Sequence, residues 1–229
     1  MAAAMTSVCS VIFDLDGTLV DSAAAIQLAL NHALSLHGLP VLPLNVVRGF
    51  IGRGVPHLMD CVGRQIGMDT SSAQFISVSN AFSARYARQQ HGNLLFDGVI
   101  EALQDLQESN VALGLCTNKP MDAARTVLQH IGIDAFFSVV VAGDSLPTRK
   151  PDPEMLWAAR DRMGPAPCLY VGDSEVDAEA AHAAGIPFLL YTRGYRKIAA
   201  EELAPWRIFD DFGALGGLVG CFVKEMPQA

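Results

Sequence analysis

Short apolar runs and longer stretches with an apolar residue every three or four positions alternate along most of the chain. The short runs predict strands at residues 11–13, 111–116, 137–142, 168–171 and 188–191, with a short edge strand at 207–209. Helical spacing predicts helices between these strands. Alternating strands and helices indicate βαβ units, so we expect an α/β fold with a doubly wound, mainly parallel sheet.

The segment from residue 18 to residue 95 interrupts this alternation. Apolar residues recur there at helical spacing in three stretches, 26–37, 55–66 and 75–86. The segment is therefore predicted to be all-helical, and it lies between the first strand and the helix that crosses over to the second. We expect an α/β core domain of residues 1–17 and 96–229, with residues 18–95 inserted as a helical cap domain over the sheet edge.

Polar residues follow the carboxyl ends of four predicted strands. They are Asp14 and Asp16 after the first strand, Thr117 and Asn118 after the second, Lys150 after the third, and Asp173 and Asp177 after the fourth. The carboxyl ends of parallel strands meet at the edge of the sheet where ligands bind. Carboxylates that lie close together repel one another unless a cation compensates for their charge. We therefore expect one polar site at this edge.

The residue types in this predicted site suit phosphate chemistry. Three carboxylates provide oxygen ligands for a hard cation such as Mg2+, which typically also binds water and phosphate oxygens. A hydroxyl and an ammonium group suit a phosphate. A carboxylate beside a metal-bound phosphate can act as a nucleophile and form an acyl phosphate. A neighbouring carboxylate can protonate the leaving oxygen and then accept a proton from water.

Several acidic residues also have a purely structural interpretation. Asp16 can belong to an ordinary turn, and Asp177 has the spacing to Ser174 of a helix capping box. Asp97 and Asp152 are predicted to cap helices. The structural interpretations would have to hold at all four strand ends together, so the site remains the stronger prediction.

A glycine-rich loop, residues 48–54, separates the first two predicted cap helices and carries two arginines. Arg48 and Arg53 are either solvated loop charges or contacts to an anionic substrate. The sequence leaves both interpretations open.

Composition narrows the possible partners and the compartment. The chain is 51% hydrophobic, with a mean hydropathy of +0.28 and a net charge of -8, which disfavours nucleic acid or an anionic membrane as a partner. No window reaches the roughly 18 apolar residues of a membrane span. Among five cysteines there is no CxxC, and Cys9, Cys116 and Cys168 lie in or beside apolar runs, which predicts buried thiols. Residues 1–10 show no signal-peptide pattern, so we expect a cytoplasmic protein.

Several motifs resemble those of a known family. Residues 13–22, Phe-Asp-Leu-Asp-Gly-Thr-Leu-Val-Asp-Ser, resemble the opening signature of the haloacid dehalogenase superfamily. The predicted helical insert is similar to the small cap of the subclass that contains phosphoglycolate phosphatases, as are the loops at residues 49–56 and 191–195. The later motifs of the superfamily are matched, in order, by Thr117-Asn118, Lys150-Pro151 and Gly172-Asp173-Ser174 with Asp177.

The resemblance implies a role for each acid. Asp14 would be the nucleophile and a metal ligand. Asp16 would be the general acid and base, and its backbone carbonyl would bind Mg2+. Asp173 would bind Mg2+ directly. Asp177 would bind the ion through water or orient Lys150.

The resemblance also implies the reaction. Thr117 and Lys150 would hold the phosphoryl group during catalysis, with Asn118 assisting. Because the dehalogenase branch lacks the Asp-x-Asp pair, we expect Mg2+-dependent hydrolysis of a small phosphomonoester through an aspartyl-phosphate. The leading candidate substrate is 2-phosphoglycolate, with its carboxylate beside Arg48, Arg53 or a backbone amide of the cap.

Other functions remain open at this point. The enzyme could be a phosphomutase of the β-phosphoglucomutase type, or a phosphatase for another small sugar or acid phosphate. A receiver domain also uses an aspartate, but such domains have about 120 residues and no cap. The expected partner is a small anionic phosphorylated substrate, and the chain is either a monomer or a homodimer.

Overall fold

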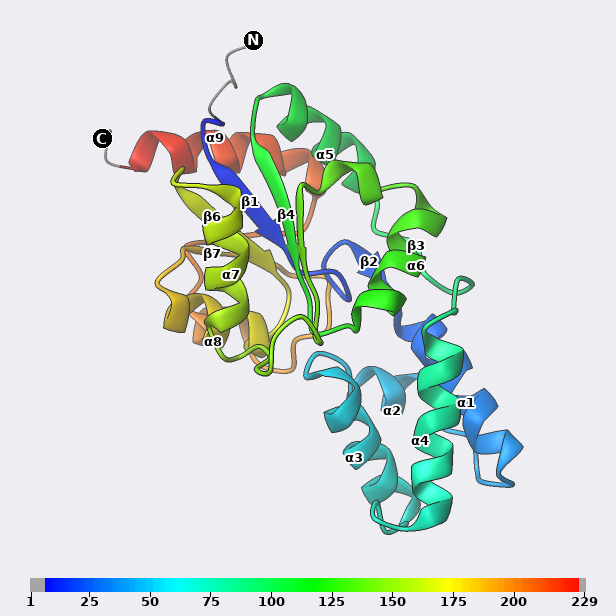
Figure 1. Ribbon diagram of the computed structural model, residues 1–229. Coiled ribbons are helices and arrows are strands. Elements are labelled where there is room, and N and C mark those ends of the chain that lie inside the picture. The colour runs from blue at the N-terminus through cyan, green and yellow to red at the C-terminus, as the bar shows by residue number, and fades with distance from the viewer. Residues whose placement is uncertain (1–6, 227–229) are drawn as a thin grey trace.

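A six-stranded parallel sheet forms the centre of the protein in the computed structural model, which describes residues 7–226. The strand order is β5-β4-β1-β6-β7-β8 (Figure 1). This confirms the predicted doubly wound, mainly parallel sheet. Residues 1–6 and 227–229, at the two ends of the predicted core domain, lie outside the described residues. The strands are β1 (Ser10–Phe13), β4 (Ala112–Cys116), β5 (Val139–Val141), β6 (Cys168–Gly172), β7 (Phe188–Tyr191) and β8 (Arg207–Phe209).

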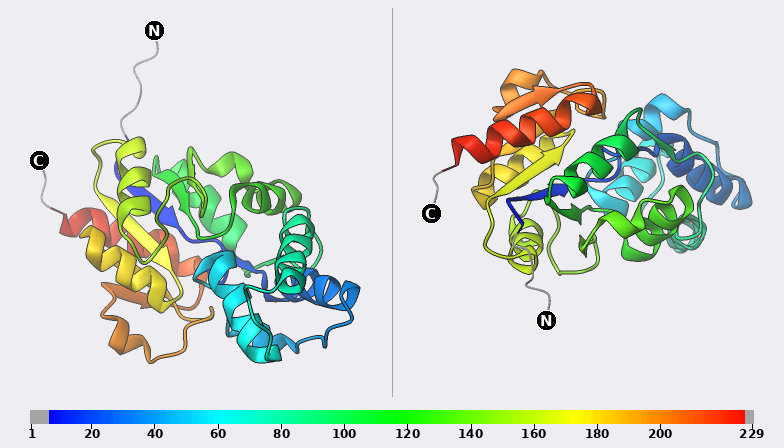
Figure 2. Two further views of the ribbon diagram at one scale, coloured as in Figure 1. Left: turned by 60° about the horizontal axis from the view of Figure 1, so that its bottom comes forward. Right: turned by 90° about the horizontal axis from the view of Figure 1, so that it is seen from above.

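Helices cover both faces of this sheet (Figures 1 and 2). Side chains of a strand alternate between the two faces. On β1, Val11 and Phe13 therefore join a hydrophobic cluster on one face, whereas Ile12 joins a second cluster on the other. The first cluster is completed by α5 (Val99–Glu108), α6 (Met121–Ile131) and α9 (Leu215–Glu225), and the second by α7 (Glu154–Met163) and α8 (Glu175–Ala184).

Four further helices and the loops between them form a bundle beyond the carboxyl ends of the central strands, and this bundle is called the cap below (Figure 1). They have a hydrophobic core of their own, in which Leu30, Met59 and Phe82 are buried. Ala123 of α6 belongs to the same cluster, so the bundle packs directly against the sheet domain. The helices are α1 (Ala23–Leu36), α2 (Leu44–Arg48), α3 (Gly54–Ile66) and α4 (Ala73–Tyr86).

The segment of residues 18–95 is not entirely helical, which corrects the prediction. Strand β2 (Val20–Asp21) pairs antiparallel with strand β3 (Leu94–Leu95). Strands of two residues are too short to show an alternating pattern, so periodicity does not reveal them. The pair brings the entry and exit of the helical bundle together.

Two helices were not expected from the sequence. Helix α2 has only five residues, and α9 contains three glycines, which disfavour a helix. Helix α9 forms because Leu215, Val219 and Phe222 are buried along one of its faces against the sheet domain. Three short 3-10 helices complete the described elements, at Asp134–Phe136, Ala200–Leu203 and Phe212–Ala214.

The two predicted helix caps differ in outcome. Asp97 does not cap α5, because the capping position is Gly98, which has a φ of +80° and forms no side-chain bond to the helix. Asp152 does act at the start of α7, since its carboxylate accepts the N–H of Glu154 at 2.9 Å.

Within residues 7–226, no helix combines the length and the hydrophobicity needed to cross a membrane. Cys9, Cys116 and Cys168 are buried free thiols, as predicted. Burial raises the pKa of Cys9 to about 11 and that of Cys116 to about 12, so both stay protonated at neutral pH. The cytoplasmic location itself stays a prediction.

Candidate active site

The chain turns directly after Asp16, at the carboxyl end of β1. Gly17 has a φ of +93°, a conformation that residues with a side chain rarely adopt, and its N–H donates to the carbonyl of Val20 at 2.8 Å. A Cβ atom on Gly17 would lie 2.6 Å from Oδ2 of Asp173. Glycine therefore lets the loop after β1 approach the loop after β6. Asp16 therefore belongs both to a turn and to the polar site, so its structural and its functional interpretation hold together.

Three buried acids meet at this edge of the sheet. Asp14, Asp173 and Asp177 each bring a carboxylate oxygen to within 4.8 Å of the others. Burial raises the pKa of Asp14 to about 7, although Lys150 opposes the shift. Burial and the neighbouring Asp177 raise the pKa of Asp173 well above its ordinary value. Such a cluster is unfavourable unless a cation compensates for it.

The donor set fits a hard divalent cation. Oδ1 of Asp14 is buried, and the polar contact that it makes among the described residues is the ion pair with Nζ of Lys150 at 2.9 Å. Asp173 accepts the Thr18 hydroxyl at Oδ1, at 3.0 Å, and the Tyr195 N–H at Oδ2. Both carboxylates keep lone pairs for a metal, and carboxylate oxygens are preferred ligands of hard cations. The predicted metal contact through the Asp16 backbone stays a prediction.

Asp177 lies near the other acids, but its oxygens are already engaged. Oδ1 accepts from Nζ of Lys150 and from the hydroxyl of Tyr170, both at 2.7 Å. Oδ2 accepts from the Ser174 N–H at 3.1 Å and from its hydroxyl at 2.6 Å. Burial would raise the pKa of Asp177, but Lys150 and these bonds outweigh burial and lower it. Asp177 therefore closes the predicted capping box and also orients Lys150.

Lys150 is buried among these acids. Its Nζ lies 2.9 Å from Oδ1 of Asp14 and 2.7 Å from Oδ1 of Asp177, and it donates to the Tyr170 hydroxyl at 2.7 Å. Burial would lower the pKa of Lys150, but Asp14 and Asp177 outweigh burial and raise it. The side chain of Asn118 accepts from the Lys150 N–H at 3.0 Å and donates to its carbonyl at 2.8 Å. The lysine is therefore held as a charged group next to Asp14.

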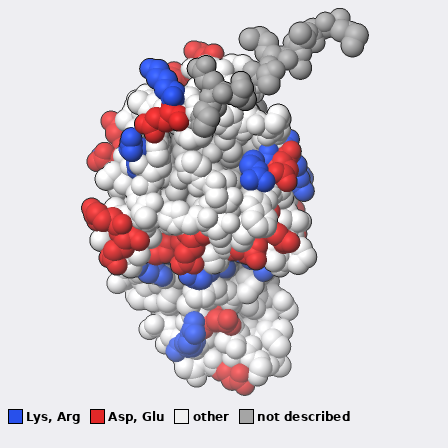
Figure 3. Space-filling view, turned by 90° about the vertical axis from the view of Figure 1, so that its left-hand side faces the viewer, with Lys and Arg blue, Asp and Glu red and all other residues white. Residues whose placement is uncertain are grey.

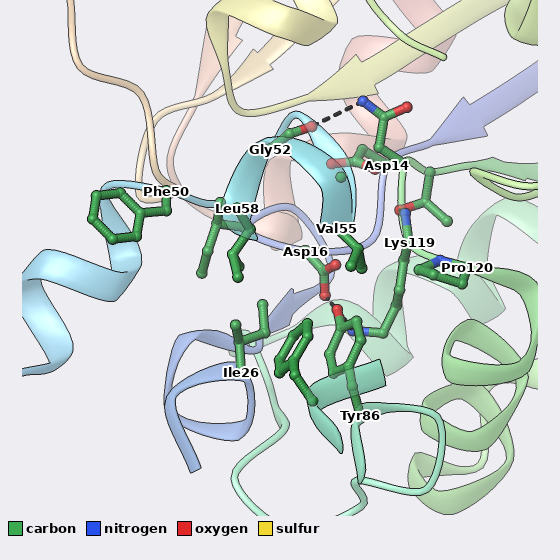
Figure 4. A pocket seen from close by; sticks show the side chains of 15 residues that line it. Asp14, Asp16, Ile26, Phe50, Gly52, Val55, Leu58, Tyr86, Lys119 and Pro120 are labelled. Carbon is green, nitrogen blue, oxygen red and sulfur yellow. Dashed lines mark hydrogen bonds and ion pairs between the residues drawn. The ribbon is translucent and has the colours of Figure 1, made fainter. Parts of the chain in front are cut away.

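Thr117 and Asn118 follow β4 and line the same cavity. Oγ1 of Thr117 accepts from the N–H of Lys119 at 3.3 Å and keeps its own proton for another acceptor, such as a phosphate oxygen. The side chain of Asn118 donates to the carbonyl of Gly52 in the cap at 2.9 Å (Figure 4). Asn118 thus joins the cap to the Lys150 loop through its side chain.

A small cavity lies between the sheet edge and the cap (Figure 4). Asp14, Asp16 and Lys119 line it from the core. The cap supplies a largely apolar wall, which includes Ile26, Phe50, Ile51, Val55, Leu58, Phe82 and Tyr86.

Lys119 is a candidate functional residue that the sequence analysis missed. Its buried Nζ donates to Oδ1 of Asp16 at 2.9 Å and to the hydroxyl of Tyr86 at 2.8 Å. Figure 4 shows the three groups together on one side of the cavity. Because Lys119 directly follows Thr117 and Asn118, the strand-end argument could have included it.

Arg48 and Arg53 are not among the residues that line the cavity. Arg48 donates to the carbonyl of Gly194 at 3.2 Å and lies over the ring of Tyr195, with 4.8 Å to its centroid. Arg53 forms an exposed ion pair of 3.7 Å with Glu179 of the core. Acidic side chains on the core lie directly above basic ones near the boundary with the cap (Figure 3). Substrate contact by either arginine stays a prediction.

Comparisons with known proteins identify the family of the chain. Residues 11–191 match the family described as haloacid dehalogenase-like hydrolase. A phosphoglycolate phosphatase from Rhodobacter capsulatus is 44% identical over 210 residues, which cover 92% of this chain and 96% of that protein. One from Haemophilus influenzae is 37% identical over 211 residues, covering 89% and 94%.

Solved structures show the same relationship. The crystal structure of a predicted phosphoglycolate phosphatase from Haemophilus somnus has a TM-score of 0.85 at 33% identity, and the match covers 94% of this chain and 99% of that one. CbbY from Rhodobacter sphaeroides, in complex with phosphate, shares the fold with a TM-score of 0.78 at 21% identity, covering 92% of this chain and 97% of that one. By its motifs, its fold and these relatives, the chain belongs to the haloacid dehalogenase-like hydrolase family.

Proposed function

We propose that the protein hydrolyses a small phosphomonoester with Mg2+, through a phosphoryl group carried on Asp14, and that 2-phosphoglycolate is its substrate. The observation that supports this most strongly is the convergence of Asp14, Asp16, Thr117 and Lys150 at one edge of the sheet. The relative that is 44% identical is named phosphoglycolate phosphatase, which supports the choice of substrate.

The proposed reaction has two steps. The Asp14 carboxylate attacks phosphorus and forms an O–P bond, while the bond from phosphorus to the leaving oxygen breaks. Asp16, in its protonated form, gives its proton to the leaving oxygen. Water then attacks phosphorus, Asp16 accepts a proton from that water, and the bond to Asp14 breaks to release phosphate.

Charge at the phosphoryl oxygens is offset by groups fixed in advance. Lys150 supplies an ammonium and Thr117 a hydroxyl donor. Mg2+, when held by Asp14 and Asp173, would neutralise further charge on the phosphoryl group. Since burial raises the pKa of Asp14 to about 7, positive charge beside it favours the ionised form that the attack needs.

The cap completes the proposed site. Its apolar wall would keep bulk water away from the phosphoryl group and limit the size of the substrate. We assign residues 1–17 and 96–229 to the catalytic core and residues 18–95 to the cap, because the pair formed by β2 and β3 lies where the chain passes between them.

A phosphate-release assay tests the proposal. Purified protein with Mg2+ is expected to release phosphate from 2-phosphoglycolate faster than from sugar phosphates or longer phosphorylated acids, and to lose this activity when EDTA removes the metal. Failure to release phosphate from any small phosphomonoester would contradict the proposal. Isomerisation of a sugar phosphate without net loss of phosphate would support the β-phosphoglucomutase alternative instead.

A further inference from the structure

We infer that Lys119 and Tyr86 form a subsite for a carboxylate on the leaving group, so that the enzyme selects phosphate esters of short α-hydroxy acids. The inference rests on the proposed function, because it concerns the substrate of that reaction. It makes Lys119 a specificity-determining residue, although none of the proposed catalytic steps uses it.

Lys119 is a buried ammonium group with spare hydrogen-bonding capacity. Its side chain is 0% exposed, and its Nζ donates to Asp16 and to Tyr86. An ammonium has three N–H donors, and these two residues are the acceptors that it meets in the described part of the chain. One donor is therefore left for an acceptor in the cavity that Lys119 lines.

Three other basic residues near the site are already engaged elsewhere. Lys150 meets three acceptors, on Asp14, Asp177 and Tyr170. Arg48 is bonded to a carbonyl outside the cavity, and Arg53 is paired with a glutamate. Lys119 is thus the one basic side chain among the described residues that line the cavity. A second anionic group on the substrate would therefore pair with the ammonium group of Lys119.

The position of Lys119 determines where the substrate carries that group. The leaving oxygen has to lie within hydrogen-bond reach of Asp16 to receive its proton. Nζ of Lys119 is 2.9 Å from the same Asp16 carboxylate, so it faces the atoms next to the leaving oxygen. In an ester of an α-hydroxy acid, one carbon separates the leaving oxygen from the carboxylate. The carboxylate of such a substrate therefore comes within reach of Lys119.

Apart from Tyr86, the cap side chains that line the cavity offer a carboxylate no hydrogen-bond donor. The side chains of Phe50, Leu58 and Phe82 carry no donor, and a carboxylate against them would lose its hydration without compensation. The Tyr86 hydroxyl accepts from Lys119 and keeps its own proton, which burial retains by raising the pKa of Tyr86 well above its ordinary value. The Tyr86 hydroxyl can therefore donate a hydrogen bond to a carboxylate oxygen. Because Tyr86 belongs to α4, the subsite is complete only when the cap lies against the core.

A substrate pair tests the inference. 2-Hydroxyethyl phosphate has the same carbon chain as 2-phosphoglycolate, with a neutral hydroxymethyl group in place of the carboxylate. In Lys119→Met, disturbance of Asp16 lowers kcat/KM for both esters. Loss of the ammonium is expected to lower kcat/KM for 2-phosphoglycolate by a further factor of roughly 10 to 100. Tyr86→Phe should also reduce the preference for 2-phosphoglycolate over 2-hydroxyethyl phosphate, but by a smaller factor.

A binding measurement separates recognition from catalysis. The Asp14→Asn protein is expected to bind both esters without turning them over. Adding Lys119→Met to it should raise the Kd for 2-phosphoglycolate by roughly 10- to 100-fold, while the Kd for 2-hydroxyethyl phosphate changes little. Lys224→Met, an exposed lysine on α9, is the matched control and should leave both the binding and the substrate preference unchanged.

Equal losses for the two esters in both variants would overturn the inference, because Lys119 would then act only through Asp16. If Lys119→Met does not fold, Tyr86→Phe alone decides: an unchanged preference for 2-phosphoglycolate over 2-hydroxyethyl phosphate in that variant overturns the inference. A wild-type enzyme that hydrolyses both esters equally well would refute the subsite and leave the phosphatase function intact. Release of no phosphate from either ester would refute the proposed function itself.

Discussion

Gly194, in the loop after β7, lies directly against the side chain of Asp173. A Cβ atom at Gly194 would overlap both the Cβ and the carboxylate of Asp173. The neighbouring Tyr195 N–H donates to the same carboxylate. The backbone of this loop therefore holds a proposed metal ligand in place, and the position has no room for a larger residue.

We expect Gly194→Ala to weaken Mg2+ binding at least about tenfold, because the added methyl group displaces the Asp173 carboxylate. Isothermal titration of Mg2+ into the metal-free protein measures this. Gly217→Ala is the matched control, since a Cβ there meets nothing within 4 Å. It should leave Mg2+ affinity unchanged and stabilise α9 by about 0.5–1 kcal/mol. Wild-type affinity in Gly194→Ala would show that Asp173 does not bind the metal.

The sequence predicted the polar edge because each acid or base directly follows a strand, and parallel strands end together. It did not predict Lys119, because a lysine is rarely buried and composition alone suggests a surface position. It also left Arg48 and Arg53 undecided. Their directions depend on a glycine-rich loop whose conformation hydrophobic periodicity does not encode.

Tyr195 connects the loop after β7 to the start of the cap. Its hydroxyl accepts from the N–H groups of Ser22 at 2.8 Å and Ala23 at 3.1 Å, and it donates to Oδ1 of Asp21 at 2.7 Å. These residues form the junction between β2 and α1. One side chain thereby fixes the entry to the cap relative to the acid cluster.

Tyr195→Phe is expected to lower the free energy of unfolding by about 1–3 kcal/mol, because the buried N–H of Ser22 loses its acceptor and the N–H of Ala23 keeps only the 3.3 Å bond to Oδ1 of Asp21. Urea unfolding followed by circular dichroism measures the change. Tyr191→Phe is a suitable control, since the Tyr191 hydroxyl makes no hydrogen bond within residues 7–226. Equal stability of the two variants would rule out the proposed link.

Elements were predictable where a pattern ran for long enough. All six strands of the central sheet were expected from short apolar runs, as were α1, α3 and α4 from helical spacing. The two-residue strands β2 and β3 carry no period of their own, and their pairing depends on contacts between distant parts of the chain. Helix α9 forms against its local propensity because burial of one face outweighs its glycines.

The molecule as a whole encloses an excess of negative charge between its two parts. Asp14, Asp173 and Asp177 are all buried where the cap meets the core, and Lys150 pairs with only two of them. The raised pKa values of Asp14 and Asp173 show that folding without a cation favours their protonated forms. Stability and metal binding should therefore be linked through pH.

For the ion-free protein, the direction in which stability changes with pH follows from Asp14, whose pKa rises from 3.8 to about 7 on folding. The contribution of Asp14 to the free energy of unfolding is greatest below about pH 4, where its carboxyl group is protonated in both the folded and the unfolded protein. This contribution decreases as pH rises from about 4 to about 7. Mg2+ binds the ionised acids, so it should raise Tm more at about pH 8 than at about pH 5. Differential scanning calorimetry with Mg2+ or EDTA tests this. Asp173→Asn should lose most of the gain, and an equal gain at both pH values would contradict the link.

The most direct test of the central claim is to find the phosphoryl group on the protein. The enzyme is mixed with Mg2+ and 2-phosphoglycolate that is radiolabelled in its phosphoryl group. The reaction is quenched with acid during turnover, and the protein is digested for peptide mapping. We predict a base-labile label on the peptide that contains Asp14, and no label in Asp14→Asn. Release of phosphate without any labelled protein, or a label on a different residue, would contradict a reaction through Asp14.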